Sequence, residues 1–394
     1  MIIKPRYKGF ICTTAHPDGC RLNVLDQIGY VKKKGAIDGP KRVLVIGASM
    51  GYGLASRISL AYGAGAKTIG VYFEKPQAGG KTGSAGWYNS AAFEEQSNRD
   101  GLLAAGINGD AYSKEVKEQT MESIRSLMPE GKVDAVIYSL ASPKRKDPDS
   151  EQVYSSVIKP IGNTFTGKTV NFHTGIVSDI SIAPADENEI RETVAVMGGE
   201  DWKLWLKALY DGGLLADGLL TMAFSYIGPG LTQAVYRDGT IGRAKVDLEL
   251  KSKEIDQMLS DIGGKSYIAV NKAVVTQSSS AIPVVPLYMS LLFKVMKEKG
   301  LHENCIEQIY RLFKEKVYNG KSIQTDESGK LRADDLEMRE DVQAEVARLW
   351  GETNSENIYE ISDLPGFRKE FFSLFGFERD EIDYDADVEL EELL

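Results

Sequence analysis

The chain has 394 residues, which exceeds one average domain and predicts either one enlarged domain or two fused domains. Hydrophobic residues make up 42% of the chain and charged residues 26%, so the chain can bury a sizeable core. The formal net charge of -10 argues against general nucleic-acid binding and against binding to an anionic membrane surface.

The first 40 residues are expected to form an extension ahead of the main sheet. Apolar runs at Ile2-Ile3 and at 10–12 predict two short strands, and residues 22–34 predict a helix. Glycine and proline in residues 35–40 then predict a turn.

Residues 41–57, with the sequence KRVLVIGASMGYGLASR, predict the feature around which the chain is organised. Val43 to Ile46 is a short apolar run typical of a buried parallel strand. Glycines follow at once with the spacing G-x-x-x-G-x-G, and a helical pattern begins directly after them. These are the parts of a dinucleotide site, because glycines let the backbone approach a pyrophosphate and the helix N-terminus binds its charge.

The second predicted strand, residues 68–73, ends at Glu74. A carboxylate in this position can accept hydrogen bonds from both ribose hydroxyls of NAD and repels a 2′-phosphate. The alternative is a solvated charge at a strand end. Lys75 follows and could tolerate a phosphate, so the pattern favours NADH over NADPH without excluding NADPH.

Two further strand ends carry residues suited to a cofactor. A third strand ends at 107–110, which places Asp110 where the adenine half of a dinucleotide rests. Asp110 could instead cap a helix from Ser113, and the two roles are compatible. The fourth strand, 133–138, leads into small residues that let backbone pack against a cofactor. The basic run 144–146 then either meets the phosphates of a substrate carrier or forms a solvated turn.

The alternation of strands and helices predicts an α/β fold, a Rossmann-type doubly wound parallel sheet with large insertions and helical C-terminal additions. We expect a single domain over 1–394, with an extension at 1–40, a nucleotide-binding and catalytic core at 41–300, an insertion at about 147–200 and a helical part at 301–394. The later predicted elements are a helix through 202–209, a strand at 219–224, helices at 231–237 and 243–262, a strand at 268–270, a loop at 271–280 and a helix at 287–299.

Tyr226, Tyr236 and Lys245 are candidate catalytic residues. Tyr236 and Lys245 are nine positions apart, so an unbroken helix would point them to opposite sides. Gly239 and Gly242 lie between them and permit a turn that brings both to one cleft. A phenol there could stabilise an oxyanion, and a lysine could bind ribose or pyrophosphate. The alternative is that both tyrosines are ordinary residues of amphipathic helices.

Other features of the sequence bear on location and metals. There is no run of about 18 apolar residues, and the N-terminal sequence lacks the apolar core of a signal peptide. Three cysteines without C-x-x-C spacing fit a reduced cytosol, so a cytoplasmic protein is expected. The three histidines are far apart in the sequence, and we expect no metal site.

Many motifs of the sequence are similar to those of one enzyme family. They are MIIKPRYKGFICTTAHPDGC, IGASMGYGLASR, GVYFEKP, GWYNSAAF, INGDAYS, VIYSLASPKR, VMGGEDW, YIGPG, a tyrosine and lysine separated by eight residues, NKAVVTQSSSAIPVVPLY, LFKVMKEKG and LRADDLE. The chain therefore resembles the NADH-dependent trans-2-enoyl-CoA and enoyl-acyl-carrier-protein reductase family, enlarged relatives of short-chain dehydrogenases. The resemblance covers the chain nearly from end to end.

The resemblance implies roles for individual residues. Tyr236 would be the proton donor, Lys245 a catalytic residue that contacts the cofactor, and Tyr226 a contact of the substrate thioester. The remaining residues of the implied NADH site are Gly47, Ala48, Ser49, Met50, Gly51, Tyr52, Phe73, Glu74, Asp110, Ala111, Leu140, Ala141, Val274, Val275 and Thr276.

The implied function is the reduction of the C2–C3 double bond of trans-2-enoyl thioesters of CoA or acyl-carrier protein, in fatty acid biosynthesis. The resemblance also suggests a monomer. One alternative is another NAD-dependent dehydrogenase of the short-chain type acting on a carbonyl or alcohol, but this would be expected to carry Y-x-x-x-K directly after the fourth strand, where the sequence has none. A non-enzymatic NAD-binding regulator would need the nucleotide site without the tyrosine pair.

Overall fold

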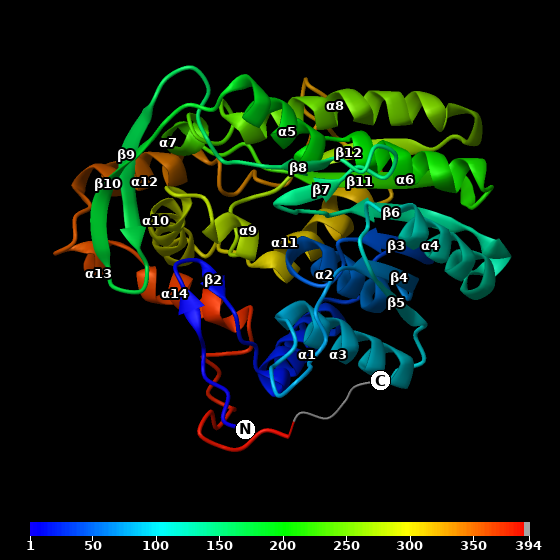
Figure 1. Cartoon of the computed structure of the whole chain (residues 1–394), viewed down its shortest axis with the longest axis horizontal. Helices are drawn as coiled ribbons and strands as arrows, with labels where there is room; N and C mark the ends of the chain where they lie inside the picture. The colour runs from blue at the N-terminus through cyan, green and yellow to red at the C-terminus, as the bar shows by residue number, and fades with distance from the viewer. Residues whose placement is uncertain (390–394) are drawn as a thin grey trace.

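Largely buried strands of five to eleven residues form the centre of the protein. The computed structural model describes residues 1–389 and shows a parallel sheet with the strand order β13-β12-β11-β6-β3-β4-β5 (Figure 1). The strands are β3 Arg42–Ile46, β4 Lys67–Tyr72, β5 Ala104–Asn108, β6 Val133–Tyr138, β11 Leu215–Ser225, β12 Lys265–Val270 and β13 Leu331–Arg332. The order reverses between β3 and β6, which confirms the predicted doubly wound fold. The short edge strand β13 was not predicted.

Helices cover both faces of this sheet, because alternate residues of each strand point to opposite sides. In β3, Val43 and Val45 belong to one core cluster with helices α1, α2, α3 and α11, whereas Leu44 and Ile46 belong to another with α4, α6 and α8. The bounds are α1 Pro17–Lys34, α2 Gly51–Ile58, α3 Ala85–Arg99, α4 Lys114–Leu127, α6 Glu200–Asp211, α8 Thr240–Met258 and α11 Cys305–Arg311. Figure 1 shows α1 and α3 on the opposite side of the sheet from α6 and α8.

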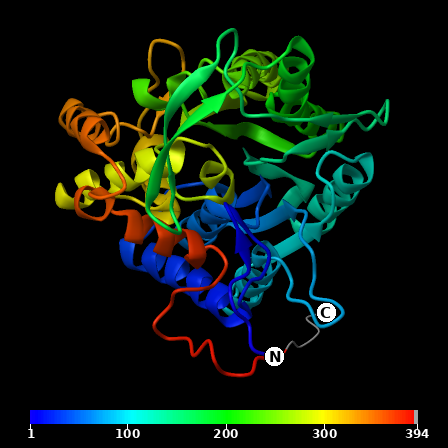
Figure 2. The same cartoon turned by 60° about the vertical axis from the view of Figure 1, so that its left-hand side comes forward.

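A third core cluster surrounds α10, Val285–Glu298, a helix that is buried along most of its length. It includes residues of the N-terminal extension, of a β-hairpin and of the C-terminal helices. The hairpin consists of β9 Phe165–Asn171 and β10 Ile176–Ile182, and the helices are α12 Glu340–Glu352, α13 Ile358–Ile361 and α14 Leu364–Ser373. Figures 1 and 2 show the hairpin beside α10 and these helices.

Several predicted elements are wrong in extent. Ile2-Ile3 is not a strand; the N-terminal hairpin pairs β1 Tyr7–Lys8 with β2 Ile11–Cys12, while Ile3 is buried in the α10 cluster. The predicted helix 231–237 is only α7 Gly230–Gln233, and the predicted loop after β12 contains α9 Gln277–Ser280.

The predicted insertion at 147–200 is more regular than expected. It contains β8 Val153–Ser155, the strands β9 and β10, and α5 Glu187–Met197. Strand β8 pairs with β7 Lys144–Lys146, which lies just before the insertion. The predicted C-terminal part extends to residue 394, and residues 390–394 lie outside the described residues. Within residues 1–389, no helix is both long enough and apolar enough to cross a bilayer.

Candidate active site

A cavity with a volume of about 520 Å³ lies at the carboxyl ends of the central strands. Its wall includes the residues that directly follow β3, β4, β6 and β11, namely Gly47, Phe73, Ser139 and Tyr226. This is the edge where the strand order reverses, and open α/β sheets bind their ligands in the crevice at such a switch point.

The turn after β3 and the first turn of α2 each have one position with space only for glycine. Gly47 has a φ of +83°, and a Cβ there would lie 2.4 Å from the Ser139 carbonyl oxygen. A Cβ at Gly53 would lie 1.8 Å from the Gly47 carbonyl oxygen. The bare backbone therefore brings the start of α2 to the cavity, and its free N–H groups fit the pyrophosphate of a dinucleotide.

Glu74 is fixed beside this turn. Its Oε1 accepts a hydrogen bond from the Ser49 hydroxyl at 2.7 Å, and its Oε2 accepts one from the Ser84 hydroxyl at 2.5 Å. The backbone N–H of Glu74 donates to the Asn108 side chain at 2.8 Å. Glu74 is thus an oriented acceptor rather than a freely solvated charge, which fits a ribose diol better than a ribose phosphate.

The next two strand ends also reach the cavity, through Asp110, Ala111, Leu140 and Ala141. The Asp110 carboxylate accepts a hydrogen bond from the backbone N–H of Tyr112 at 3.0 Å. Helix α4 is capped by Ser113 itself, whose Oγ accepts from the Val116 N–H at 3.1 Å. The Asp110 side chain is therefore not the cap of this helix.

The basic run 144–146 does not act as one patch. Arg145 is buried and donates to the Ala195 carbonyl at 2.7 Å and to Glu200 at 2.9 Å. Lys144 and Lys146 are exposed, and Lys146 pairs with Glu151 at 3.2 Å. Arg145 therefore joins β7 to the end of α5 and the start of α6. Of the three basic residues, only Lys144 and Lys146 are accessible to a phosphate group.

The chain turns between Tyr236 and Lys245, as predicted. Gly239 is extended and precedes α8, and a Cβ at Gly242 would lie 1.7 Å from the Arg237 carbonyl oxygen. Tyr236, Lys245 and Tyr226 all line the cavity. The tyrosine rings pack edge to face, with centroids 5.2 Å apart and planes inclined by 72°.

Burial shifts the pKa values of the ionisable groups in the cavity wall. Lys245 Nζ donates to the Phe224 carbonyl at 3.1 Å, and burial lowers the pKa of Lys245 to about 8. Burial raises the pKa of Tyr236 and of Tyr226, and the neighbouring Glu337 carboxylate raises the pKa of Tyr226 further. Both phenols therefore carry their protons near neutral pH.

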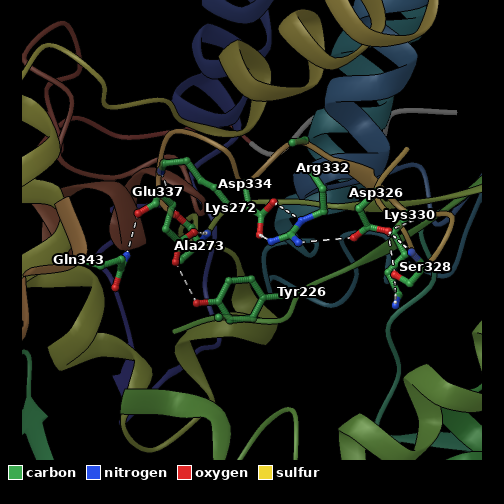
Figure 3. A network of polar contacts seen from close by, with 12 residues as sticks. Tyr226, Lys272, Ala273, Asp326, Ser328, Lys330, Arg332, Asp334, Glu337 and Gln343 are labelled. Atoms are coloured by element: carbon green, nitrogen blue, oxygen red, sulfur yellow. Dashed lines mark hydrogen bonds and ion pairs between the residues drawn. The ribbon is translucent and has the colours of Figure 1, made fainter. Parts of the chain in front are cut away.

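The two phenols differ in their hydrogen bonds. Tyr226 donates its hydroxyl hydrogen to Glu337 Oε1 at 3.1 Å (Figure 3). Within residues 1–389, Tyr236 Oη has no hydrogen-bond partner. Its hydrogen is thus available to a ligand in the cavity, and this difference cannot be read from the sequence.

Of the predicted site residues, all line the cavity except Ala48 and Val275, which are buried behind its wall. Sequence reasoning missed several other lining residues. They include Met197, Ser278, Ile282, Val285 and Leu374. Ser139 was expected near the cofactor as the first small residue after the fourth strand, whereas Glu337 lies 111 residues from its partner Tyr226 with no spacing rule to connect them. Residues 1–389 contain no group of three or more metal-ligating side chains.

The fold and the cavity define a dinucleotide-dependent oxidoreductase with a tyrosine and a lysine at its centre. Three family models match the chain: "Trans-2-enoyl-CoA reductase catalytic region" over 81–318, "NAD(P)H binding domain of trans-2-enoyl-CoA reductase" over 2–79 and "Enoyl reductase FAD binding domain" over 325–388. The chain belongs to the trans-2-enoyl-CoA reductase family, as its motifs predicted.

Relatives agree with this assignment over the full length. The chain is 60% identical to an enoyl-[acyl-carrier-protein] reductase [NADH] of Flavobacterium johnsoniae, covering 98% of both chains. It is 55% identical to a trans-2-enoyl-CoA reductase [NADH] of Ruminiclostridium cellulolyticum, covering 99% of this chain and 98% of the relative. The crystal structure of Treponema denticola trans-2-enoyl-CoA reductase in complex with NAD superposes with a TM-score of 0.95, at 48% identity and full coverage of both chains.

The third family description names FAD, but residues 325–388 do not fit a dinucleotide of their own. Their one strand, β13, has two residues and is followed by 333–339, which contain no glycine before α12. Their helices α12 and α14 pack against α10 instead. The family model for NAD(P)H binding covers residues 2–79 instead and includes the glycine turn after β3, whose geometry fits a dinucleotide.

Proposed function

We propose that this protein reduces the C2–C3 double bond of trans-2-enoyl thioesters with NADH, producing saturated acyl thioesters. The observation that carries the proposal is one cavity that joins the glycine turn after β3 with Tyr226, Tyr236 and Lys245. The family match supplies the class of reaction, and relatives that act on CoA and on acyl-carrier-protein thioesters support both carriers as substrates.

The proposed mechanism divides the work among three side chains. When bound, NADH would supply the hydride for C3 of the enoyl group. Tyr236 donates a hydrogen bond to the thioester oxygen, which takes up the negative charge as an enolate, and supplies the proton that ends on C2 when the saturated thioester forms. The Lys245 ammonium group contacts the cofactor and lowers the energy of the nearby negative charge. Tyr226, packed against the Tyr236 ring, also contacts the thioester.

The carrier and the biological setting belong to the same proposal. CoA and acyl-carrier protein present the same phosphopantetheine arm, and the exposed Lys144 and Lys146 can meet phosphate in either case. We propose a monomer that acts in the cytoplasm in fatty acid biosynthesis, which agrees with its three free cysteines and with the enoyl-acyl-carrier-protein reductases among its relatives.

Turnover at the nicotinamide absorbance tests the function directly. Crotonyl-CoA and crotonyl-acyl-carrier protein are compared side by side with NADH, followed by longer enoyl chains. Oxidation of NADH that depends on the enoyl substrate is expected with at least one carrier. A protein that binds NADH, reduces a 3-ketoacyl thioester and leaves both enoyl substrates unchanged would contradict the proposal and favour a carbonyl reductase.

A further inference from the structure

Glu337 is a fully buried carboxylate in the turn between β13 and α12, far in sequence from the rest of the site. Its Oε1 accepts hydrogen bonds from the hydroxyls of Tyr226 at 3.1 Å and Tyr288 at 2.7 Å. Its Oε2 accepts a hydrogen bond from the Ala273 backbone N–H at 2.6 Å. Figure 3 shows Glu337 together with Tyr226, Ala273 and Gln343.

The backbone that carries Glu337 is fixed from both sides. On one side, the Ala333 N–H donates to the Val270 carbonyl at 2.8 Å and continues the pairing of β13 with β12. On the other side, the Gln343 side chain donates to the Glu337 carbonyl oxygen at 2.7 Å and to the Tyr288 hydroxyl at 3.0 Å. The carboxylate therefore has little freedom to leave Tyr226.

Three donors converge on one carboxylate, and this decides the direction of each hydrogen bond. A buried carboxylate is costly unless its lone pairs are satisfied, and an ionised one can only accept. The hydrogen of Tyr226 thus points to Glu337, and the cavity meets only the lone pairs of the Tyr226 oxygen. Tyr236, packed against the Tyr226 ring, keeps its own hydrogen free.

The same carboxylate also reaches the cofactor side of the cavity. Ala273 lines the cavity and directly precedes Val274, the start of the predicted NADH-contacting segment 274–276. Lys272 is buried and donates to the carbonyls of Ala273 at 2.9 Å and Glu303 at 2.8 Å, so this backbone is held at its carbonyl as well as at its N–H. Glu337 links the proposed substrate tyrosine to that segment.

We propose that Glu337 is a positioning residue of the reductase: it orients the Tyr226 hydroxyl and leaves Tyr236 as the phenol that donates to the thioester oxygen. This role rests on the proposed function. It also gives the C-terminal segment 325–388 a part in the active site, as the element that carries the orienting carboxylate.

The test is a double-mutant cycle of Glu337→Gln and Tyr226→Phe with crotonyl-CoA. An amide cannot accept at both ends, so in Glu337→Gln its NH2 faces either the Ala273 N–H or the two tyrosine hydroxyls. We expect kcat to fall at least about tenfold, with the Kd of NADH changed less than about threefold. In the Tyr226→Phe background, Glu337→Gln should reduce kcat less than about twofold, because the interaction it disrupts is already gone.

Tyr288→Phe is the matched control. It removes a donor to the same Glu337 oxygen, but Tyr288 is fully buried and is not part of the cavity wall. We expect kcat within about threefold of the wild-type value and a loss of thermal stability similar to that of Glu337→Gln. A loss of kcat as large as that of Glu337→Gln would overturn the positioning role, because general destabilisation would then explain both variants.

Glu337→Asp keeps the charge but shortens its reach, and it should lose less kcat than Glu337→Gln with the same non-additivity toward Tyr226→Phe. If Glu337→Gln does not fold, Glu337→Asp replaces it in the double-mutant cycle with Tyr226→Phe. Equal losses of kcat in the wild-type and Tyr226→Phe backgrounds would overturn the role of Glu337 while leaving the proposed function intact. A folded wild-type protein that does not oxidise NADH with any enoyl thioester would overturn both.

Discussion

At the scale of single residues, two chemically identical phenols of the cavity wall differ in their hydrogen bonds because their neighbours differ. Tyr226 gives its hydrogen to Glu337, whereas Tyr236 has no such partner within residues 1–389. The local sequence does not distinguish the two tyrosines as candidate proton donors, since both lie near glycines. Only the family motif, a tyrosine and a lysine separated by eight residues, selects Tyr236. The structure adds the physical reason, which is that a donor already committed to a carboxylate has no hydrogen left for a substrate.

The first prediction concerns Tyr236→Phe. The change removes one hydroxyl donor from the developing oxyanion and no atom from the aromatic packing, so the fold should persist. We expect kcat with crotonyl-CoA to fall about 100- to 1000-fold, as for other oxyanion donors. The Kd of NADH, measured by nicotinamide fluorescence, should change little. Turnover equal to that of the wild type would show that another group supplies the proton.

The second prediction concerns the pH dependence of NADH binding. Burial lowers the pKa of Lys245 to about 8, so a rise in pH through this value removes its positive charge in the free protein. If the ammonium form binds the anionic cofactor, affinity falls as pH rises, and the Kd at pH 9 should be about ten times that at pH 7. The Kd of NADH is measured for the wild type and for Lys245→Met at both pH values. The variant should bind NADH weakly at both, so any pH dependence that it keeps does not come from Lys245. A wild-type Kd that is constant over this range would contradict the role of Lys245.

At the scale of elements, the sequence predicts best where burial is complete. The bounds of β6 agree with prediction because Val133–Tyr138 is apolar except for Asp134 and lies between the polar residues Lys132 and Ser139. The hairpin β9–β10 was missed because all but one of its strand residues are partly buried or exposed, and its threonines, serines and lysine mask the strand alternation. Residues of the site were predicted where they directly follow a buried strand, as Glu74 does. Glu337 was not predicted, because its hydrogen bond with Tyr226 joins distant parts of the chain and no local pattern encodes it.

The break between α7 and α8 gives the third prediction. In Gly242→Ala the new methyl group would meet the Arg237 carbonyl, so the turn must open and Tyr236 and Lys245 must shift apart. We expect a loss of about 2 to 3 kcal/mol in the free energy of unfolding and a large loss of kcat. Gly230→Ala is the control, since nothing lies within 4 Å of a Cβ there. Urea denaturation and turnover of both variants provide the measurement, and an active, stable Gly242→Ala would show that the turn tolerates a side chain.

At the scale of the whole molecule, segments from both ends of the chain are packed around α10. Ile3 and Cys20 from the N-terminal part, Phe172 from the insertion and Phe371 from α14 belong to the same core cluster as α10. The ring of Phe371 is fully buried, with the Phe172 centroid 4.9 Å away. This arrangement supports the prediction that the chain is one domain, although its family models divide it into three ranges.

The fourth prediction follows from that shared core. Phe371→Ala leaves a cavity among aromatic rings contributed by distant parts of the chain and should lower the free energy of unfolding by about 3 to 5 kcal/mol. If the chain is one cooperative unit, the loss of helical circular dichroism and the loss of NADH binding should shift to the same lower urea concentration. If residues 325–388 form a separate unit, part of the helical signal should be lost first while the glycine turn after β3 still binds NADH. Because Glu337 reaches Tyr226 from this segment, turnover would then disappear before NADH binding does.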